Sequence, residues 1–66
     1  MFAYVKVAQA IENHNNAHRA MHGSLFAGDY MSSVGTLSEQ LAARYGWKAV
    51  DRGWELVRFR AAKYSE

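Results

Sequence analysis

The chain has 66 residues, of which 50% are hydrophobic and 14% aromatic, and its formal net charge is +2. This length allows one domain, spanning residues 1–66, and the hydrophobic content favours a folded domain over a disordered chain. The sequence contains no cysteine, which excludes disulfides, thiolate metal sites and cysteine nucleophiles. A domain of this size buries only about 60% of its unfolded surface, so we expect association with other chains, including a homodimer.

Positive charge gathers toward the end of the sequence. Of the eight Lys and Arg residues, six lie after residue 43, where the net charge is +3, whereas residues 1–43 carry −1. A basic segment of this kind favours acidic partners, either a protein surface or a nucleic acid. The chain shows no signal-peptide pattern and no apolar run long enough to span a bilayer. We therefore expect a cytoplasmic protein with no membrane association.

Residues 3–22 predict one amphipathic helix, with apolar residues and three histidines at helical spacing on one face. Gly23 is a natural stop for it. His14, His18 and His22 follow one another at intervals of four, so any adjacent pair could chelate a metal ion. All three cannot hold one ion, because the outer two are separated by about 12 Å of helix rise. We expect no metal or other cofactor here, and instead a half-polar contact with a neighbouring helix or subunit. A pH-sensitive interface is a further alternative, because three close histidines would repel one another once protonated.

Residues 23–36 have the glycine and serine content of a loop, but their apolar residues are too many for a solvated linker. This indicates an ordered loop packed on the core, or a short helical turn after Asp29. Phe26, Tyr30 and Met31 in this segment form a second candidate surface for a partner. Thr36 and Glu39 then form a capping-box pattern, which predicts a helix over 37–45 that ends or kinks at Gly46.

The segment from Trp47 onward has two interpretations. Its apolar residues alternate in steps of three and four, which predicts a helix over 47–64 with one apolar stripe. The stripe consists of Trp47, Val50, Trp54, Val57, Ala61 and Tyr64. Gly53 interrupts this helix at a cost of about 1 kcal/mol relative to alanine. Alternatively, residues 47–50 and 54–59 pair as a hairpin across residues 51–53.

The fold class that these segments favour is all-α. We expect a compact three-helix mini-domain with helices at 3–22, 37–45 and 47–64 and an ordered apolar loop between the first two. The first and last helices would pack along their stripes to form the core. The alternative is an α+β domain in which a C-terminal β-hairpin packs on the 37–45 helix.

The sequence gives little support for catalysis. It contains no nucleophile elbow, no phosphate-binding glycine loop and no zincin motif, and we expect no enzyme. The last helix instead places a small apolar patch among basic residues, the composition of an interaction surface. The residues predicted to bind a partner are Lys48, Arg52, Leu56, Phe59, Arg60 and Lys63.

This pattern favours a non-enzymatic interaction module that occupies an acidic surface of a larger protein. Small chains without catalytic motifs are often phage or mobile-element proteins that block or redirect a host machine, so we expect an inhibitor or modulator.

The alternative is a small DNA-binding regulator that acts as a dimer. In residues 38–57, Leu41 and Ala42 followed by Gly46 resemble the first half of a helix-turn-helix. The second half departs from that motif, because Arg52 stands where a buried aliphatic residue is expected. The resemblance implies that Lys48, Arg52 and Arg58 contact the nucleic acid.

Overall fold

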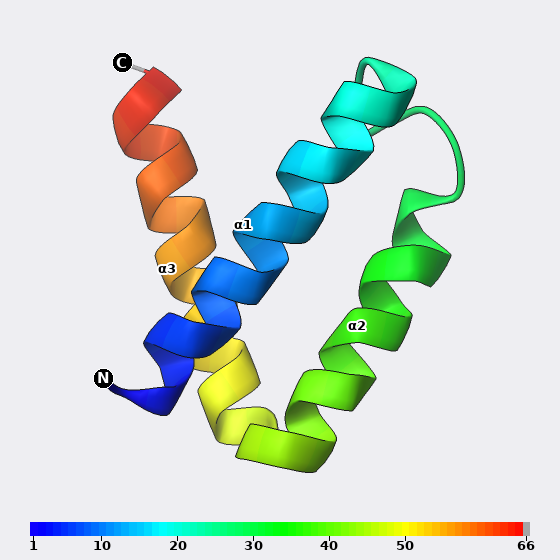
Figure 1. Cartoon of the computed structure of the whole chain (residues 1–66). Helices are drawn as coiled ribbons and strands as arrows, with labels where there is room; N and C mark the ends of the chain where they lie inside the picture. The colour runs from blue at the N-terminus through cyan, green and yellow to red at the C-terminus, as the bar shows by residue number, and fades with distance from the viewer. Residues whose placement is uncertain (66) are drawn as a thin grey trace.

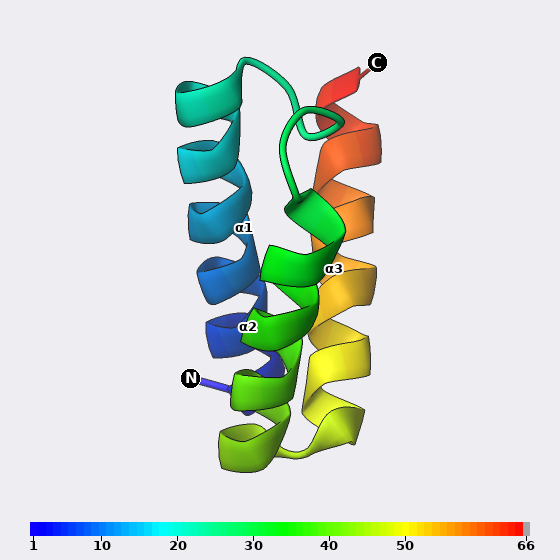
Figure 2. The same ribbon diagram turned by 90° about the vertical axis from the view of Figure 1, so that its right-hand side faces the viewer.

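The computed structural model describes the backbone of residues 1–65 and the side chains of residues 1–63. It consists of α1 (Ala3–His22), α2 (Tyr30–Tyr45) and α3 (Trp47–Ser65). Residues 1–65 contain no strand. The prediction of an all-α, three-helix domain is therefore confirmed, and the alternative with a C-terminal hairpin is wrong. Helices α1 and α3 run in the same direction, and α2 runs back antiparallel to both (Figures 1 and 2).

The core lies between the first and the last helix, as their apolar stripes predict. Val7 and Ile11 of α1 and Val50 of α3 are fully buried. Partly buried side chains from α2 and α3 pack around these three residues: Leu37, Leu41, Ala42, Tyr45, Ala49, Trp54 and Val57. Helix α2 is joined to this core by a hydrogen bond that Trp54 Nε1 donates to Ser38 Oγ over 3.3 Å.

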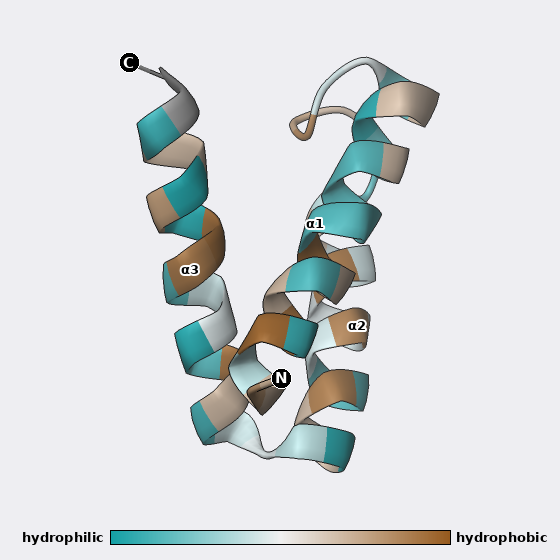
Figure 3. Ribbon diagram, turned by 60° about the vertical axis from the view of Figure 1, so that its left-hand side comes forward, coloured by the Kyte–Doolittle hydropathy of each residue, from teal (hydrophilic) through white to brown (hydrophobic). Residues whose placement is uncertain are grey.

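Helices α1 and α3 approach closely at Gly53. A Cβ atom added to this glycine would lie 2.4 Å from Val7 Cγ1, 2.8 Å from Val7 Cβ and 3.1 Å from the carbonyl oxygen of Tyr4. The absence of a side chain therefore lets the two helices pack here. Beyond this contact they diverge toward their C-terminal ends, as the open V in Figures 1 and 3 shows.

Helix α2 begins at Tyr30 rather than at residue 37, so the prediction of a capping box at Thr36 is wrong. A helical turn does follow Asp29, as the sequence allowed, and it continues without a break into the rest of α2. Thr36 lies inside this helix, where its hydroxyl donates to the carbonyl of Ser32 over 3.0 Å. The earlier start has a packing reason, because Val34 is buried one turn before Leu37 on the same stripe.

The loop over residues 23–29 is ordered but shorter than expected. Gly23 closes α1 in a left-handed conformation with φ of 82°, and its N–H donates to the carbonyl of Arg19. His18 Nε2 donates to the carbonyl of Ala27 over 2.6 Å, which fixes the middle of the loop. Figure 3 shows a hydrophobic segment at the loop, where Phe26 is 99% exposed. This phenyl ring therefore does not pack on the core.

A single residue, Gly46, connects α2 to α3. Its φ of 88° and ψ of 153° are accessible to glycine and strained for other residues. Its N–H donates to the carbonyl of Ala42, and its own carbonyl accepts from the N–H of Val50. Among the described residues, no helix combines the length and the apolar character needed to cross a membrane.

Candidate basic-apolar surface and groove

Five of the six predicted partner-binding residues form a basic-apolar face along α3: Lys48, Arg52, Leu56, Phe59 and Lys63. Their spacing of three and four residues places them on one side of the helix. The lysines and the arginine are exposed and Leu56 is half-buried, while Phe59 is 66% exposed. An apolar ring surrounded by cations is thus presented to solvent.

Arg52 is held in place by an aromatic residue of α1. Its guanidinium carbon lies 4.8 Å from the centre of the Tyr4 ring, and the Phe2 ring stacks on Tyr4 with centroids 5.8 Å apart. A guanidinium over an aromatic face gains cation–π energy while its N–H groups stay free at the edge. Tyr4 therefore contributes to this surface from outside α3, a role that the spacing within α3 could not predict.

Arg60, the sixth predicted residue, turns toward α1 instead. Its Nη1 donates to Glu12 Oε1 over 2.6 Å, and 37% and 26% of the two side chains remain exposed. The pair joins α1 to α3 where the helices diverge. Because Glu12 neutralises Arg60, this arginine contributes less positive charge to the outward face than the sequence pattern predicted.

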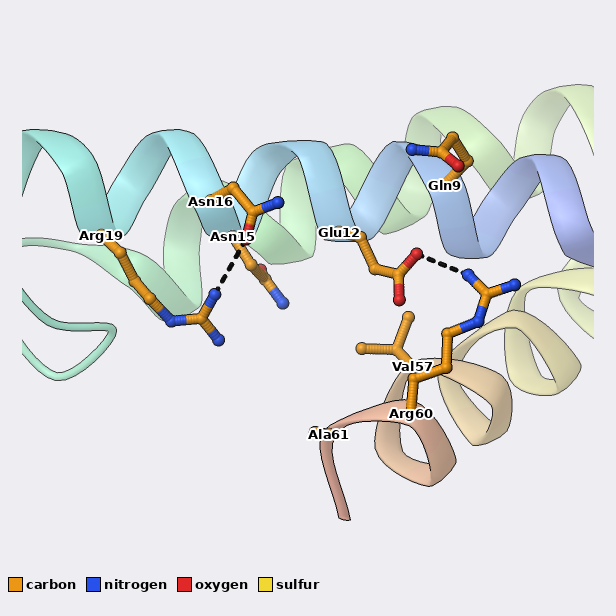
Figure 4. A pocket seen from close by; sticks show the side chains of 8 residues that line it. All are labelled: Gln9, Glu12, Asn15, Asn16, Arg19, Val57, Arg60 and Ala61. Carbon is orange, nitrogen blue, oxygen red and sulfur yellow. Dashed lines mark hydrogen bonds and ion pairs between the residues drawn. The ribbon is translucent and has the colours of Figure 1, made fainter. Parts of the chain in front are cut away.

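The Arg60–Glu12 pair is part of the wall of a groove between α1 and α3 (Figure 4). The groove encloses about 530 Å³ and opens to solvent, a size within the range of small-ligand sites. Polar side chains of α1 form one side, and residues of α3 form the other. The lining residues are Gln9, Glu12, Asn15, Asn16, Arg19, Val57, Arg60 and Ala61.

Asn15 is the buried polar residue of this groove, with 5% of its surface exposed. Its Oδ1 accepts a hydrogen bond from the Tyr30 hydroxyl over 2.8 Å. Burial raises the pKa of Tyr30 above its usual value, although the bond to Asn15 and the charge of Arg19 act in the opposite direction. The amide and the phenol therefore tie α1 to the start of α2, and Arg19 lies close enough for its charge to act on the phenol.

The three histidines line the side of α1 that faces the loop and α2. The centroids of the His14 and His18 rings are 6.2 Å apart and those of His18 and His22 are 4.5 Å apart, and the edge of Tyr30 packs against His18. His14 Nε2 is 2.5 Å from Ser33 Oγ. In the described part of the chain, no group of three His, Cys, Asp or Glu side chains could hold a metal ion. His14 and His18 therefore join α1 to α2 and the loop, whereas His22 packs on His18 of its own helix.

Three functional features were not found from the sequence: Tyr4 beneath Arg52, Glu12 opposite Arg60, and Asn15 in the groove. Tyr4 and Glu12 meet their partners only through the crossing of α1 and α3. No role was predicted for Asn15. A usable signal existed for Asn15, since it follows Val7, Ala8 and Ile11 at helical spacing on the buried face.

Comparison with known protein families, characterised proteins and solved structures gave no match to this chain.

Proposed function

We propose that this protein is a non-enzymatic interaction module that inhibits or modulates a larger protein by occupying an acidic surface on it. The observation that supports this proposal is the exposed Phe59 ring among cations on α3. Among the described residues, the Arg60–Glu12 pair is the one ion pair, so Lys48, Arg52 and Lys63 are not paired with any carboxylate in that part of the chain. Exposed aromatic residues next to arginine are typical of interface hot spots.

The charge of this surface argues for a partner of different composition rather than a second copy. In a symmetric dimer through α3, Lys48, Arg52 and Lys63 of both copies would share one interface. Like charges brought together in this way cost several kcal/mol. A partner surface with carboxylates around an apolar pocket would instead pair with the cations and accept Phe59.

The connection between α2 and α3 favours protein binding over helix-turn-helix DNA recognition. That motif joins its helices through a turn of three to four residues, whereas here Gly46 alone joins α2 and α3. In addition, Arg60 is neutralised by Glu12, which leaves one cation fewer on α3 to follow a phosphate backbone.

The test is capture of partners from a lysate by the tagged protein, after nuclease treatment and at two salt concentrations. Phe59→Ala should remove a defined protein from the captured set. Met21→Ala is the control, since Met21 is another large apolar side chain that is exposed, but it lies on α1 rather than on α3. It should leave the captured set unchanged.

Two outcomes contradict the proposal. The first is a captured set that stays the same after Phe59→Ala and Leu56→Ala together. The second is recovery of nucleic acid that is lost steeply with added salt, as expected for binding through phosphate contacts. That second outcome would support the DNA-binding alternative.

A further inference from the structure

The groove between α1 and α3 presents hydrogen-bond donors at the end near Arg19. The Oδ1 of Asn15 is occupied by the Tyr30 hydroxyl, so the amide NH₂ is the part of Asn15 that remains to act as a donor. Figure 4 shows this amide and the Arg19 guanidinium on the groove side of α1, and both residues line the groove. Arg19 Nη1 donates to Asn16 Oδ1 over 3.1 Å, which orients the guanidinium and leaves other N–H groups for a ligand.

The net charge of the groove suits a ligand that carries one negative charge. Arg19 and Arg60 are cationic, and Glu12 is paired with Arg60, so the lining carries a net charge of +1. An arginine binds a carboxylate through two parallel N–H···O bonds, which suits a planar monoanion. A phosphate dianion fits less well, because the Glu12 carboxylate in the same wall would repel its second charge.

Apart from Arg60, the residues that line the other side of the groove are apolar. Val57 and Ala61 come from α3, one turn apart, and both line the groove opposite the α1 donors. Val57 is half-buried and belongs to the layer around the core. A ligand whose carboxylate contacts Arg19 would therefore rest its attached carbon chain on these two side chains.

We propose that this groove binds a peptide carboxylate next to an apolar carbon chain, with Arg19 and Asn15 as donors and Val57 and Ala61 as the apolar floor. The carboxylate can belong to a C-terminal residue with an aliphatic side chain, or to a glutamate side chain with its own methylenes. This site is separate from the outward face of α3 and does not depend on the function proposed for that face.

The test is an NMR titration of the ¹⁵N-labelled protein that follows the Asn15 side-chain NH₂ and the Arg19 Nε–H signals. The probes are N-acetyl-leucine with a free carboxylate, N-acetyl-glutamic acid α-amide, N-acetyl-leucinamide and inorganic phosphate. Both carboxylates should produce saturable shifts, and the tighter one identifies the source. The neutral leucinamide should bind about ten-fold more weakly or worse, because it loses a charge-assisted pair.

Variants separate this site from a general attraction to a basic protein. Arg19→Gln should weaken the binding of N-acetyl-leucine about ten-fold. This variant should fold normally because Arg19 is exposed. Arg58→Gln removes an exposed arginine that does not line the groove and should change nothing. If Arg19→Gln and the unaltered protein bind N-acetyl-leucine with equal affinity, the proposal is overturned. So does tighter binding of phosphate or leucinamide than of either carboxylate.

The variant Phe59→Ala distinguishes this proposal from the preceding one. Phe59 is not part of the groove, so this variant should bind N-acetyl-leucine with unchanged affinity even where it no longer captures a protein partner. Loss of carboxylate binding in Phe59→Ala, with the fold intact, would place the carboxylate on the face of α3 and contradict the groove site.

Discussion

Replacing Gly53 with alanine tests whether this residue sets the distance between α1 and α3. In an exposed helix position this change stabilises a protein by about 1 kcal/mol, because glycine has a poor helix propensity. At Gly53 the new Cβ would lie 2.4 Å from Val7 Cγ1 and 2.8 Å from Val7 Cβ. Rotation of the valine cannot relieve the second contact, since Cβ does not move with χ1. The helices themselves must separate.

The cost of that separation follows from the contact distances. Carbon atoms pack at about 3.5–4.0 Å, so α1 and α3 must move apart by about 1 Å. A gap of this size forfeits a quarter to a half of each dispersion contact around Val7, Ile11 and Val50. We expect about 3–5 kcal/mol of lost packing against about 1 kcal/mol of gained propensity. The free energy of unfolding should therefore fall by about 2–4 kcal/mol, out of a total near 3–10 kcal/mol for this length.

Urea denaturation followed by circular dichroism measures this change, with Gly35→Ala as the control. Gly35 lies within α2, and a Cβ added there meets nothing within 4 Å, so the control should gain about 1 kcal/mol. Adding Val7→Ala to Gly53→Ala should cost less than the sum of the two single changes, because it removes the atom in the closest contact. If Gly53→Ala stabilises the protein as much as Gly35→Ala does, the close approach of the helices is refuted.

Three further substitutions test the contacts around this core and the groove. Tyr30→Phe should cost about 1–3 kcal/mol, because it removes the hydrogen bond to the buried Asn15. Burial raises the pKa of Tyr30 in the folded protein, so this phenol ionises at a lower pH in the unfolded chain. Above pH 10 the free energy of unfolding, measured by chemical denaturation at each pH, should therefore fall as the pH rises. It should fall less steeply in Tyr30→Phe. Glu12→Gln should cost at most about 1 kcal/mol in chemical denaturation, less in high salt, because the pair with Arg60 is partly exposed. Val50→Ala should cost about 2–4 kcal/mol in the same assay, since this side chain is fully buried, and a loss below 1 kcal/mol would contradict its place in the core.

Most of the fold could be predicted from hydrophobic spacing. The first helix was placed over 3–22 because its stripe is unbroken and Gly23 ends it, and the last helix was placed within one residue of its described end. The start of α2 was missed, because the residues around Gly35 have the composition of a loop. The prediction followed this composition, although Val34 extends the apolar stripe of α2 by one turn before Leu37.

The candidate sites were predictable only where they depend on one helix. The face of α3 with Phe59 and Arg52 follows from spacing within a single segment. The groove does not, because it depends on the angle at which α1 and α3 diverge. The partner of Arg60 lies 48 residues away in the sequence, and no local pattern connects such positions. Gly53 is a further case, since its sequence context alone indicates a weak point rather than a packing contact.

The core between the first and last helices has a consequence for the order of folding. Val7 and Ile11 lie near the start of the chain, and the buried residue that covers them, Val50, lies in α3. During synthesis α1 and α2 are therefore made before the core can close, and most of the stability of a helix in a protein comes from tertiary packing. The nascent chain must remain unfolded and open to chaperones or proteases until α3 emerges. A chain that stops before Val50 should not acquire a stable structure at all.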